Sequence, residues 1–223
     1  MQLDRRTLLG SLGAATATGL AGCLGGGGGD SDAAARIGMV YATGGLGDGS
    51  FNDQAQSGIV RAQEELSIAY DESQPDSPSD FATLQQQYAQ SSDPAYDLVC
   101  CIGFLQADSL TGNASEYPDQ QFMIVDSTVD ADNVGSYVFR EHEGSFLVGL
   151  LAGRLTTMSF DAGAGSTAGD STNVGFVGGI ESDLIKRFEA GFTAGVGYAS
   201  DDVDVQTAYV GDFNDPSGGQ EAA

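Results

Sequence analysis

Short apolar runs alternate with helix-type periods from residue 36 to the end of the chain. Runs of β-type residues predict strands, and apolar residues three and four positions apart predict the helices between them. The predicted strands cover residues 36–42, 67–70, 97–102, 121–125, 134–138, 173–177 and 203–210. The predicted helices cover residues 51–66, 81–90, 106–116, 143–156 and 182–199.

This alternation predicts an α/β fold in which parallel sheets are covered by helices on both faces. Ligands of such open sheets bind at the carboxyl ends of the strands. Residues 158–172, rich in Gly, Ala, Ser and Asp, are predicted to form an exposed loop. Residues 214–217 (NDPS) are typical of a helix start, with proline at the first helical position. Because a domain rarely ends on a helix start, we expect the chain to be truncated at its carboxyl end.

The charge of the chain restricts its partners. Its 223 residues include 8 Lys and Arg against 32 Asp and Glu, a formal net charge of -24. A nucleic-acid partner is excluded because binding to phosphates requires clustered basic side chains, and Lys186 is the single lysine of the sequence. We interpret the excess of aspartate as halophilic, since concentrated salt screens carboxylate repulsion.

The first 35 residues are predicted to direct export and anchoring. Residues 1–22 resemble a twin-arginine lipoprotein signal peptide, with Arg5 and Arg6 before an uncharged stretch too short to span a membrane. That stretch ends in Leu20-Ala21-Gly22-Cys23, which resembles a lipobox and predicts that the Cys23 thiol carries a lipid. Residues 23–35 then form a Gly-rich tether. The mature protein is therefore expected on the extracytoplasmic face of the membrane.

Few residues offer catalytic or metal chemistry. Cys100 and Cys101 are adjacent on a predicted strand, so they point to opposite faces and are expected to be buried and unpaired. With His142 as the one histidine, a Cys/His zinc site is excluded. His142 lies between two glutamates in a charged helix start that we expect to be exposed. The glycines at 44–49 do not fit the spacing of a dinucleotide fingerprint. No catalytic residue and no cofactor are expected.

Several motifs together resemble those of one known family. Residues 47–52 (GDGSFN), after the first predicted strand, resemble the Asp-Lys-Ser-Phe-Asn signature of the basic membrane protein family. Further blocks agree in order and spacing at residues 139–149 (FREHEGSFLVG), 174–179 (VGFVGG), 187–192 (RFEAGF) and 209–216 (YVGDFNDP). Members of this family are nucleoside-binding lipoproteins of ABC importers and include the purine nucleoside receptor.

The resemblance implies a type I periplasmic-binding-protein fold, in which two α/β lobes close on a ligand. Residues 36–138 would form the first lobe and residues 139–223 an incomplete second lobe. The implied function is that of a lipid-anchored substrate-binding protein that captures a nucleoside, purine nucleosides in particular, and presents it to an ABC permease. Two alternatives remain open: a surface α/β enzyme acting on nucleosides, and a ligand-sensing receptor without transport.

The resemblance also implies a set of ligand-binding residues. Phe51 and Phe188 would hold the purine between them, Asn52 would hydrogen-bond the ligand, and Asp126 would accept hydrogen bonds from the ribose hydroxyls. Asp48 is a further candidate. The sequence by itself leaves structural roles open: Phe188 has the spacing of a helix core residue, Phe51 begins a helix, and Asp126 could cap a turn.

Overall fold

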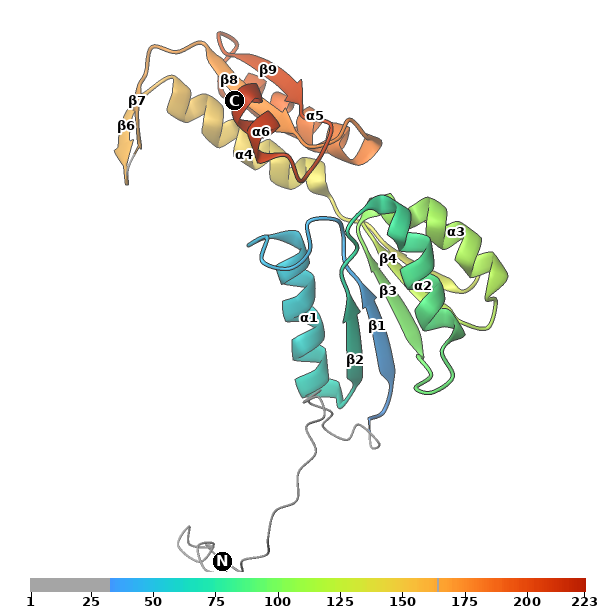
Figure 1. Cartoon of the computed structure of the whole chain (residues 1–223). Helices are drawn as coiled ribbons and strands as arrows, with labels where there is room; N and C mark the ends of the chain where they lie inside the picture. Colours follow the sequence, from blue (N-terminus) through green and yellow to red (C-terminus); the bar gives the residue numbers. More distant parts are fainter. Residues whose placement is uncertain (1–32, 164) are drawn as a thin grey trace, which may run out of the picture. The chain divides into compact units, whose positions relative to one another are not determined.

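The computed structural model describes residues 33–163 and 165–223 (Figure 1). The predicted signal peptide, the lipidation site Cys23 and nearly all of the predicted tether lie outside the described residues. In the described part of the chain, no helix combines the length and the apolar character needed to cross a membrane.

A five-stranded parallel sheet organises residues 36–137, in the order β2-β1-β3-β4-β5. The parallel α/β fold predicted from the alternation is thereby confirmed. The strands are β1 (Arg36–Val40), β2 (Ala69–Ser73), β3 (Leu98–Ile102), β4 (Gln121–Val125) and β5 (Val134–Tyr137). Because Val40 pairs with Cys101 and Ile102 pairs with Val125, the strands β1, β3 and β4 end at one edge of the sheet.

Helices cover both faces of this sheet, as Figure 1 shows. The helix α1 (Phe51–Leu66) packs on the face that carries Cys100. The helices α2 (Phe81–Gln90) and α3 (Ala107–Glu116), which follow the short 3-10 turns η1 (Pro78–Asp80) and η2 (Phe104–Gln106), pack on the face that carries Cys101. Both cysteines are buried and unpaired, which confirms the prediction from their adjacent positions.

Residues 141–222 form a helix pair, a second parallel strand pair and a terminal helix. The helices are α4 (Glu141–Thr156) and α5 (Asp183–Ala199), and the paired strands are β8 (Asn173–Gly178) and β9 (Asp204–Tyr209). The helix α6 (Pro216–Ala222) begins where the sequence predicted, with the Asp215 side chain accepting a hydrogen bond from the Gly218 amide. The division into lobes at residues 138 and 139 stays a prediction.

Several local predictions were wrong, among them the start of α4, which lies at Glu141 and not at residue 143. Residues 158–172 are not one loop, because β6 (Ser159–Ala162) and β7 (Gly165–Ala168) form an antiparallel hairpin. These strands are almost wholly exposed, so they lack the buried apolar alternation that identifies a strand in a sequence. The second strand begins two residues later than predicted because Ser67 ends α1 in the left-handed conformation, with a φ of 55°.

Candidate ligand-binding site

A cavity of about 500 Å³ lies at the carboxyl ends of the parallel strands. Ala42, Gly103 and Asp126 line it just beyond β1, β3 and β4. The rest of its wall includes residues of the α1 start, of η2, of α5 and of the segment before α6. All five residues assigned to ligand binding from the sequence line this strand-end cavity: Asp48, Phe51, Asn52, Asp126 and Phe188. The structure therefore brings the candidate residues together, although their positions span 141 residues of sequence (188 minus 48, counting both ends).

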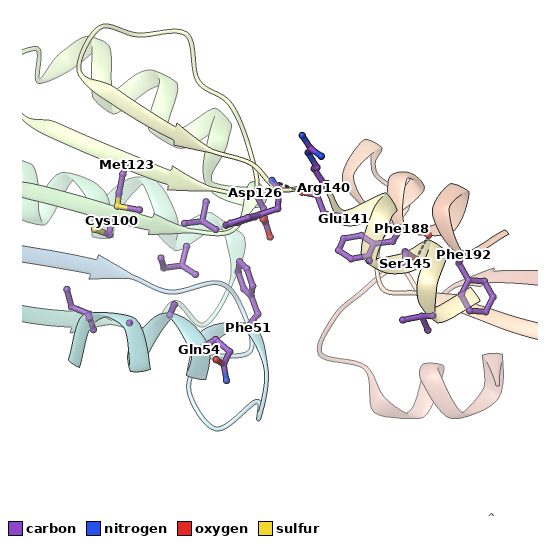
Figure 2. A pocket seen from close by; sticks show the side chains of 18 of the residues that line it. Phe51, Gln54, Cys100, Met123, Asp126, Arg140, Glu141, Ser145, Phe188 and Phe192 are labelled. Carbon is purple, nitrogen blue, oxygen red and sulfur yellow. Dashed lines mark hydrogen bonds between the residues drawn. The ribbon is translucent and has the colours of Figure 1, made fainter. Parts of the chain in front are cut away.

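A second, larger cavity of about 1120 Å³ adjoins the first. Phe51, Asp126 and Phe188 line both cavities. Figure 2 shows Phe51 and Asp126 at the strand ends, and Arg140 and Glu141 at the beginning of α4. Most of the remaining wall is apolar, so a ligand at Phe51, Asp126 and Phe188 would meet two aromatic rings, one carboxylate and an apolar surface.

Gly103 keeps the floor of the strand-end cavity open. Its φ of 106° lies in the region that side chains avoid. A Cβ atom there would lie 3.2 Å from the Cβ of Ala42 and 3.4 Å from the Cε1 of Phe51. A larger residue at this position would strain the backbone and press on the Phe51 ring.

The glycine-rich loop before α1 is held by its own aspartates. The amides of Gly47 and Gly49 donate to the carboxylate of Asp53, at 2.7 and 2.8 Å. Asp48 accepts from the amides of Ser50 and Asn52, at 2.8 and 2.9 Å, and from the amide of Asp53. Because these amides already have acceptors, the loop has the hydrogen bonding of a helix start and not of a phosphate cradle.

The hydrogen bonds at Asp48 also decide its charge. Burial would raise the pKa of Asp48, but the amides of Asn52, Ser50 and Asp53 stabilise its carboxylate, so the net pKa lies below the usual range. The charged carboxylate thus organises the beginning of α1. A direct contact between Asp48 and a ligand stays a prediction.

Asn52 is almost fully buried and ties the first strand to the first helix. Its Oδ1 accepts a hydrogen bond of 2.9 Å from the amide of Ala42, just beyond β1. This bond places Phe51, the preceding residue, at the rim of the cavity. Asn52 therefore has a clear structural role, and its contact with a ligand stays a prediction.

Phe51 and Phe188 are both partly buried, unlike core residues such as Phe192. Phe51 packs beside the cluster formed by Ile37, Met39 and Ile59, and Phe188 lies one turn before the buried Phe192 on α5. Each ring thus has a supported side and a side at the cavity wall. Such partial exposure suits an aromatic residue that stacks on a ligand.

Asp126 follows the last residue of β4 in an unusual backbone conformation. Its φ of 64° is left-handed, which aspartate tolerates better than most residues, and its amide donates to the carbonyl of Tyr137 at 2.8 Å. Burial, followed by the negative charge of Glu141, raises the pKa of Asp126 above its usual value. A carboxylate in this setting gains from a ligand that donates hydrogen bonds to it.

Glu141 is the residue that sequence reasoning missed. The helix start was expected to be exposed, and His142 and Glu143 are exposed, but Glu141 retains 8% of its accessible surface. Its Oε1 accepts a hydrogen bond of 3.2 Å from the Phe139 amide, whereas its Oε2 is buried without a hydrogen-bond partner. Glu141 lies within a block quoted for the family resemblance, which was the one available signal.

Gln106 holds together the strand ends beside the cavity, from the face of the sheet that α2 and α3 cover. Its Nε2 donates to the carbonyls of Val40 and Ile102, at 2.8 and 2.9 Å, and its Oε1 accepts from Gln85 at 3.1 Å. The bonds fix the ends of β1 and β3 relative to each other. Their donor is fully buried, so each bond also satisfies a polar group that has no access to water.

Within residues 33–163 and 165–223, no group of three or more His, Cys, Asp and Glu side chains is arranged to hold a metal ion.

A family model for PnrA-like ABC transporter substrate-binding proteins matches residues 35–223. The chain belongs to this Bmp family. The family consists of substrate-binding proteins and not of enzymes, in line with the absence of catalytic motifs noted in the sequence.

Several curated relatives support the family membership. The chain is 36% identical over 193 residues to a CD4+ T-cell-stimulating antigen of Listeria monocytogenes and 34% identical over 212 residues to an uncharacterised lipoprotein of Pyrococcus abyssi. It is 31% identical over 193 residues to the ABC transporter nucleoside-binding protein BmpA of Lactococcus lactis. The matches cover 84%, 92% and 84% of this chain, and 50% of each relative, so the chain spans about half their length.

A solved structure agrees with the fold. An ABC transporter solute-binding protein of Aeropyrum pernix K1 superposes with a TM-score of 0.73 at 30% identity, covering 84% of this chain and 50% of the solved one. The periplasmic-binding-protein-like α/β class that the resemblance implied is thus confirmed for this Bmp-family chain.

Proposed function

We propose that the protein is the substrate-binding component of an ABC importer and that its ligand is a nucleoside, specifically a purine nucleoside. The observation that carries the proposal is that Phe51, Phe188 and Asp126 line the same cavity at the strand ends. The name of the Lactococcus lactis relative, a nucleoside-binding protein, supports the ligand class.

The chemistry of these three side chains fits a nucleoside. Aromatic rings that contact a flat base bury its apolar faces and gain from offset stacking. A carboxylate accepts hydrogen bonds from sugar hydroxyls, and bonds to a charged acceptor are stronger than neutral ones. Asp126 is partly withdrawn from water in the folded protein. Hydrogen bonds from a ligand would replace part of the hydrogen bonding to water that its carboxylate loses on folding.

A titration with nucleosides tests this proposal. We expect isothermal calorimetry to give binding of adenosine, guanosine or inosine by the purified protein, and weaker binding of pyrimidine nucleosides, free sugars and amino acids. Phe51→Ala should weaken binding by about 5- to 150-fold, since base stacking on a protein aromatic contributes about 1–3 kcal/mol.

The matched control is Phe160→Ala, which removes an exposed ring of β6 that lines neither cavity. Its affinity should equal that of the parent protein. Melting of both variants without ligand separates binding from folding, because loss of a core phenylalanine would cost about 3–5 kcal/mol of stability. No binding of any nucleoside by the folded parent protein would contradict the proposal.

The proposal includes the place and partner of the protein. We propose that a lipid on Cys23 holds it at the extracytoplasmic face of the cell membrane, where it delivers the nucleoside to the permease of the importer. The lipoprotein name of the Pyrococcus abyssi relative supports the anchor. Cys23→Ser should move the protein from the membrane fraction to the medium, and a variant that stays in the membrane fraction would contradict this anchor.

A further inference from the structure

The unpartnered oxygen of Glu141 is the most unusual polar atom at the cavity wall. The Glu141 side chain is 4% exposed, and its Oε2 makes no hydrogen bond within the described chain. Buried carboxylate oxygens nearly always have hydrogen-bond partners, because removing such a group from water without replacement is costly. An orphan acceptor of this kind calls for a donor that the described chain does not supply.

Arg187 does not supply that donor. Its Nη1 lies 3.8 Å from the Glu141 Oε2, beyond hydrogen-bond distance, and its side chain is 51% exposed. An ion pair with so exposed a partner is screened by solvent and contributes little. The other oxygen of Glu141 is already engaged by the Phe139 amide, which fixes the direction of the carboxylate.

The position of Glu141 connects it to the candidate ligand residues. It lines the larger cavity together with Phe51, Asp126 and Phe188, which also line the strand-end cavity. Its charge also acts on Asp126, whose pKa it helps to raise. Two carboxylates at one cavity wall repel each other, and hydrogen-bond donors placed near both would relieve that repulsion.

We propose that Glu141 is a second ligand-contacting carboxylate, whose Oε2 accepts a hydrogen bond from a hydroxyl or N–H group of the ligand held at Phe51, Asp126 and Phe188. This inference rests on the proposed function. It assigns the site a requirement for ligands that carry at least two separate donors, one for each carboxylate. The family resemblance assigned no role to this residue.

The test compares Glu141→Gln with Glu143→Gln. The glutamine at 141 keeps an oxygen for the Phe139 amide and replaces the Oε2 acceptor by an NH₂ donor. Glu143 is an exposed glutamate two residues further along α4 that does not line the larger cavity. Calorimetry with adenosine should show an affinity about 10- to 100-fold lower for Glu141→Gln, the usual effect of losing a hydrogen bond to a charged group, and no change for Glu143→Gln.

Ligand analogues distinguish a direct contact from a structural role. The probes are 2′-, 3′- and 5′-deoxyadenosine and purine riboside, each of which lacks one donor group of adenosine. For the analogue that lacks the group bound by Glu141, the parent protein and Glu141→Gln should have equal affinity.

Each remaining outcome contradicts the inference in a recognisable way. Equal losses with all analogues, or the same loss in Arg187→Gln, would mean that Glu141 acts by holding the fold or the ion pair. Unchanged adenosine affinity in Glu141→Gln would overturn the inference while the proposed function stands. Absence of nucleoside binding by the parent protein would overturn both.

Discussion

The hydroxyl of Ser145 on α4 donates a hydrogen bond of 2.5 Å to the backbone carbonyl of Phe188 on α5. Ser145 is buried at the contact between these helices and also lines the larger cavity. The bond therefore ties the backbone of one of the two candidate stacking residues to the helix that begins with Glu141. It links the position of Phe188 to the packing of α4 against α5.

Removal of this bond should loosen Phe188 without removing its ring. We expect Ser145→Ala to lower the free energy of unfolding by about 1 kcal/mol, the usual contribution of one hydrogen bond. Nucleoside affinity should fall less than in Phe51→Ala, because the ring remains. Thermal melting and calorimetry on the same variant measure both effects.

Ser57→Ala is the control for this change. The Ser57 hydroxyl donates to the Asp53 carbonyl of its own helix and lies on an exposed surface of α1. It should alter neither stability nor affinity by a measurable amount. Equal changes in stability and in affinity for the two variants would contradict the positioning role of Ser145.

The order of helices and strands was predictable because the β-type runs are short, apolar and separated by regular helical periods. The run 98–102 (LVCCI) is buried throughout or nearly so, as expected of a central parallel strand. The β6–β7 hairpin was not predictable, because its strands are held by backbone pairing and bury almost no side chain. Its turn includes Gly163 with a φ of 58°, which the sequence shows only as one more glycine.

The candidate site was predictable only through the resemblance. Helical spacing alone predicts that Phe188 is a core residue, like its buried neighbours Leu184 and Phe192. Only the fold shows that Phe188 stays partly exposed. The burial of Glu141 depends on contacts between distant segments. A glutamate in the first turn of a helix is normally solvated, so nothing local in the sequence predicts that its Oε2 is buried.

The raised pKa of Asp126 predicts a cost to stability at neutral pH. Burial and the charge of Glu141 favour the protonated form, so the folded state binds more protons than the unfolded state between the two pKa values. The free energy of unfolding therefore falls as the pH rises through this window. Asp126→Asn removes this cost and also suits the left-handed φ of 64°.

We expect ligand-free Asp126→Asn to melt at a higher temperature than the parent protein at pH 7. The difference should shrink as the pH falls toward the usual aspartate pKa of about 4. Its nucleoside affinity should be lower, because a neutral acceptor replaces a charged one. The exposed Asp130→Asn is the control, and a lower melting temperature for Asp126→Asn at pH 7 would contradict the argument.

The acidic composition predicts a dependence of stability on salt. Exposed carboxylates lie close together in the turn before β9 and at its first residue, namely Asp201, Asp202 and Asp204. Screening reaches about 30 Å at 0.01 M salt and about 3 Å at 1 M, so repulsion within such clusters fades as salt is added. The melting temperature followed by circular dichroism should rise between 0.01 and 1 M NaCl.

Neutralising that cluster is the internal comparison for the salt effect. The triple variant Asp201→Asn, Asp202→Asn, Asp204→Asn should melt higher than the parent at low salt and gain less from added salt. A melting temperature that is the same at 0.01 and 1 M NaCl would refute the halophilic interpretation.

Glycines allow α4 and α5 to touch through their backbones, and this contact gives the last prediction. A Cβ at Gly195 would lie 2.0 Å from the Phe146 carbonyl oxygen, and one at Gly149 would lie 2.0 Å from that of Phe192. Since neither backbone can yield without separating the helices, Gly195→Ala should destabilise the fold by about 1–3 kcal/mol.

Gly197→Ala is the matched control two residues along the same helix. A Cβ there meets no atom within 4 Å, so alanine should stabilise the helix by about 0.5–1 kcal/mol through its better propensity. The two substitutions should thus shift the melting temperature in opposite directions, by about 2–4 °C per kcal/mol for a chain of this size. Because α5 carries Phe188 and α4 begins with Glu141, Gly195→Ala should also weaken nucleoside binding, whereas Gly197→Ala should leave it unchanged. Equal stabilisation of both variants would mean that the two helices are not in backbone contact. It would also contradict the positioning of Phe188 by α4.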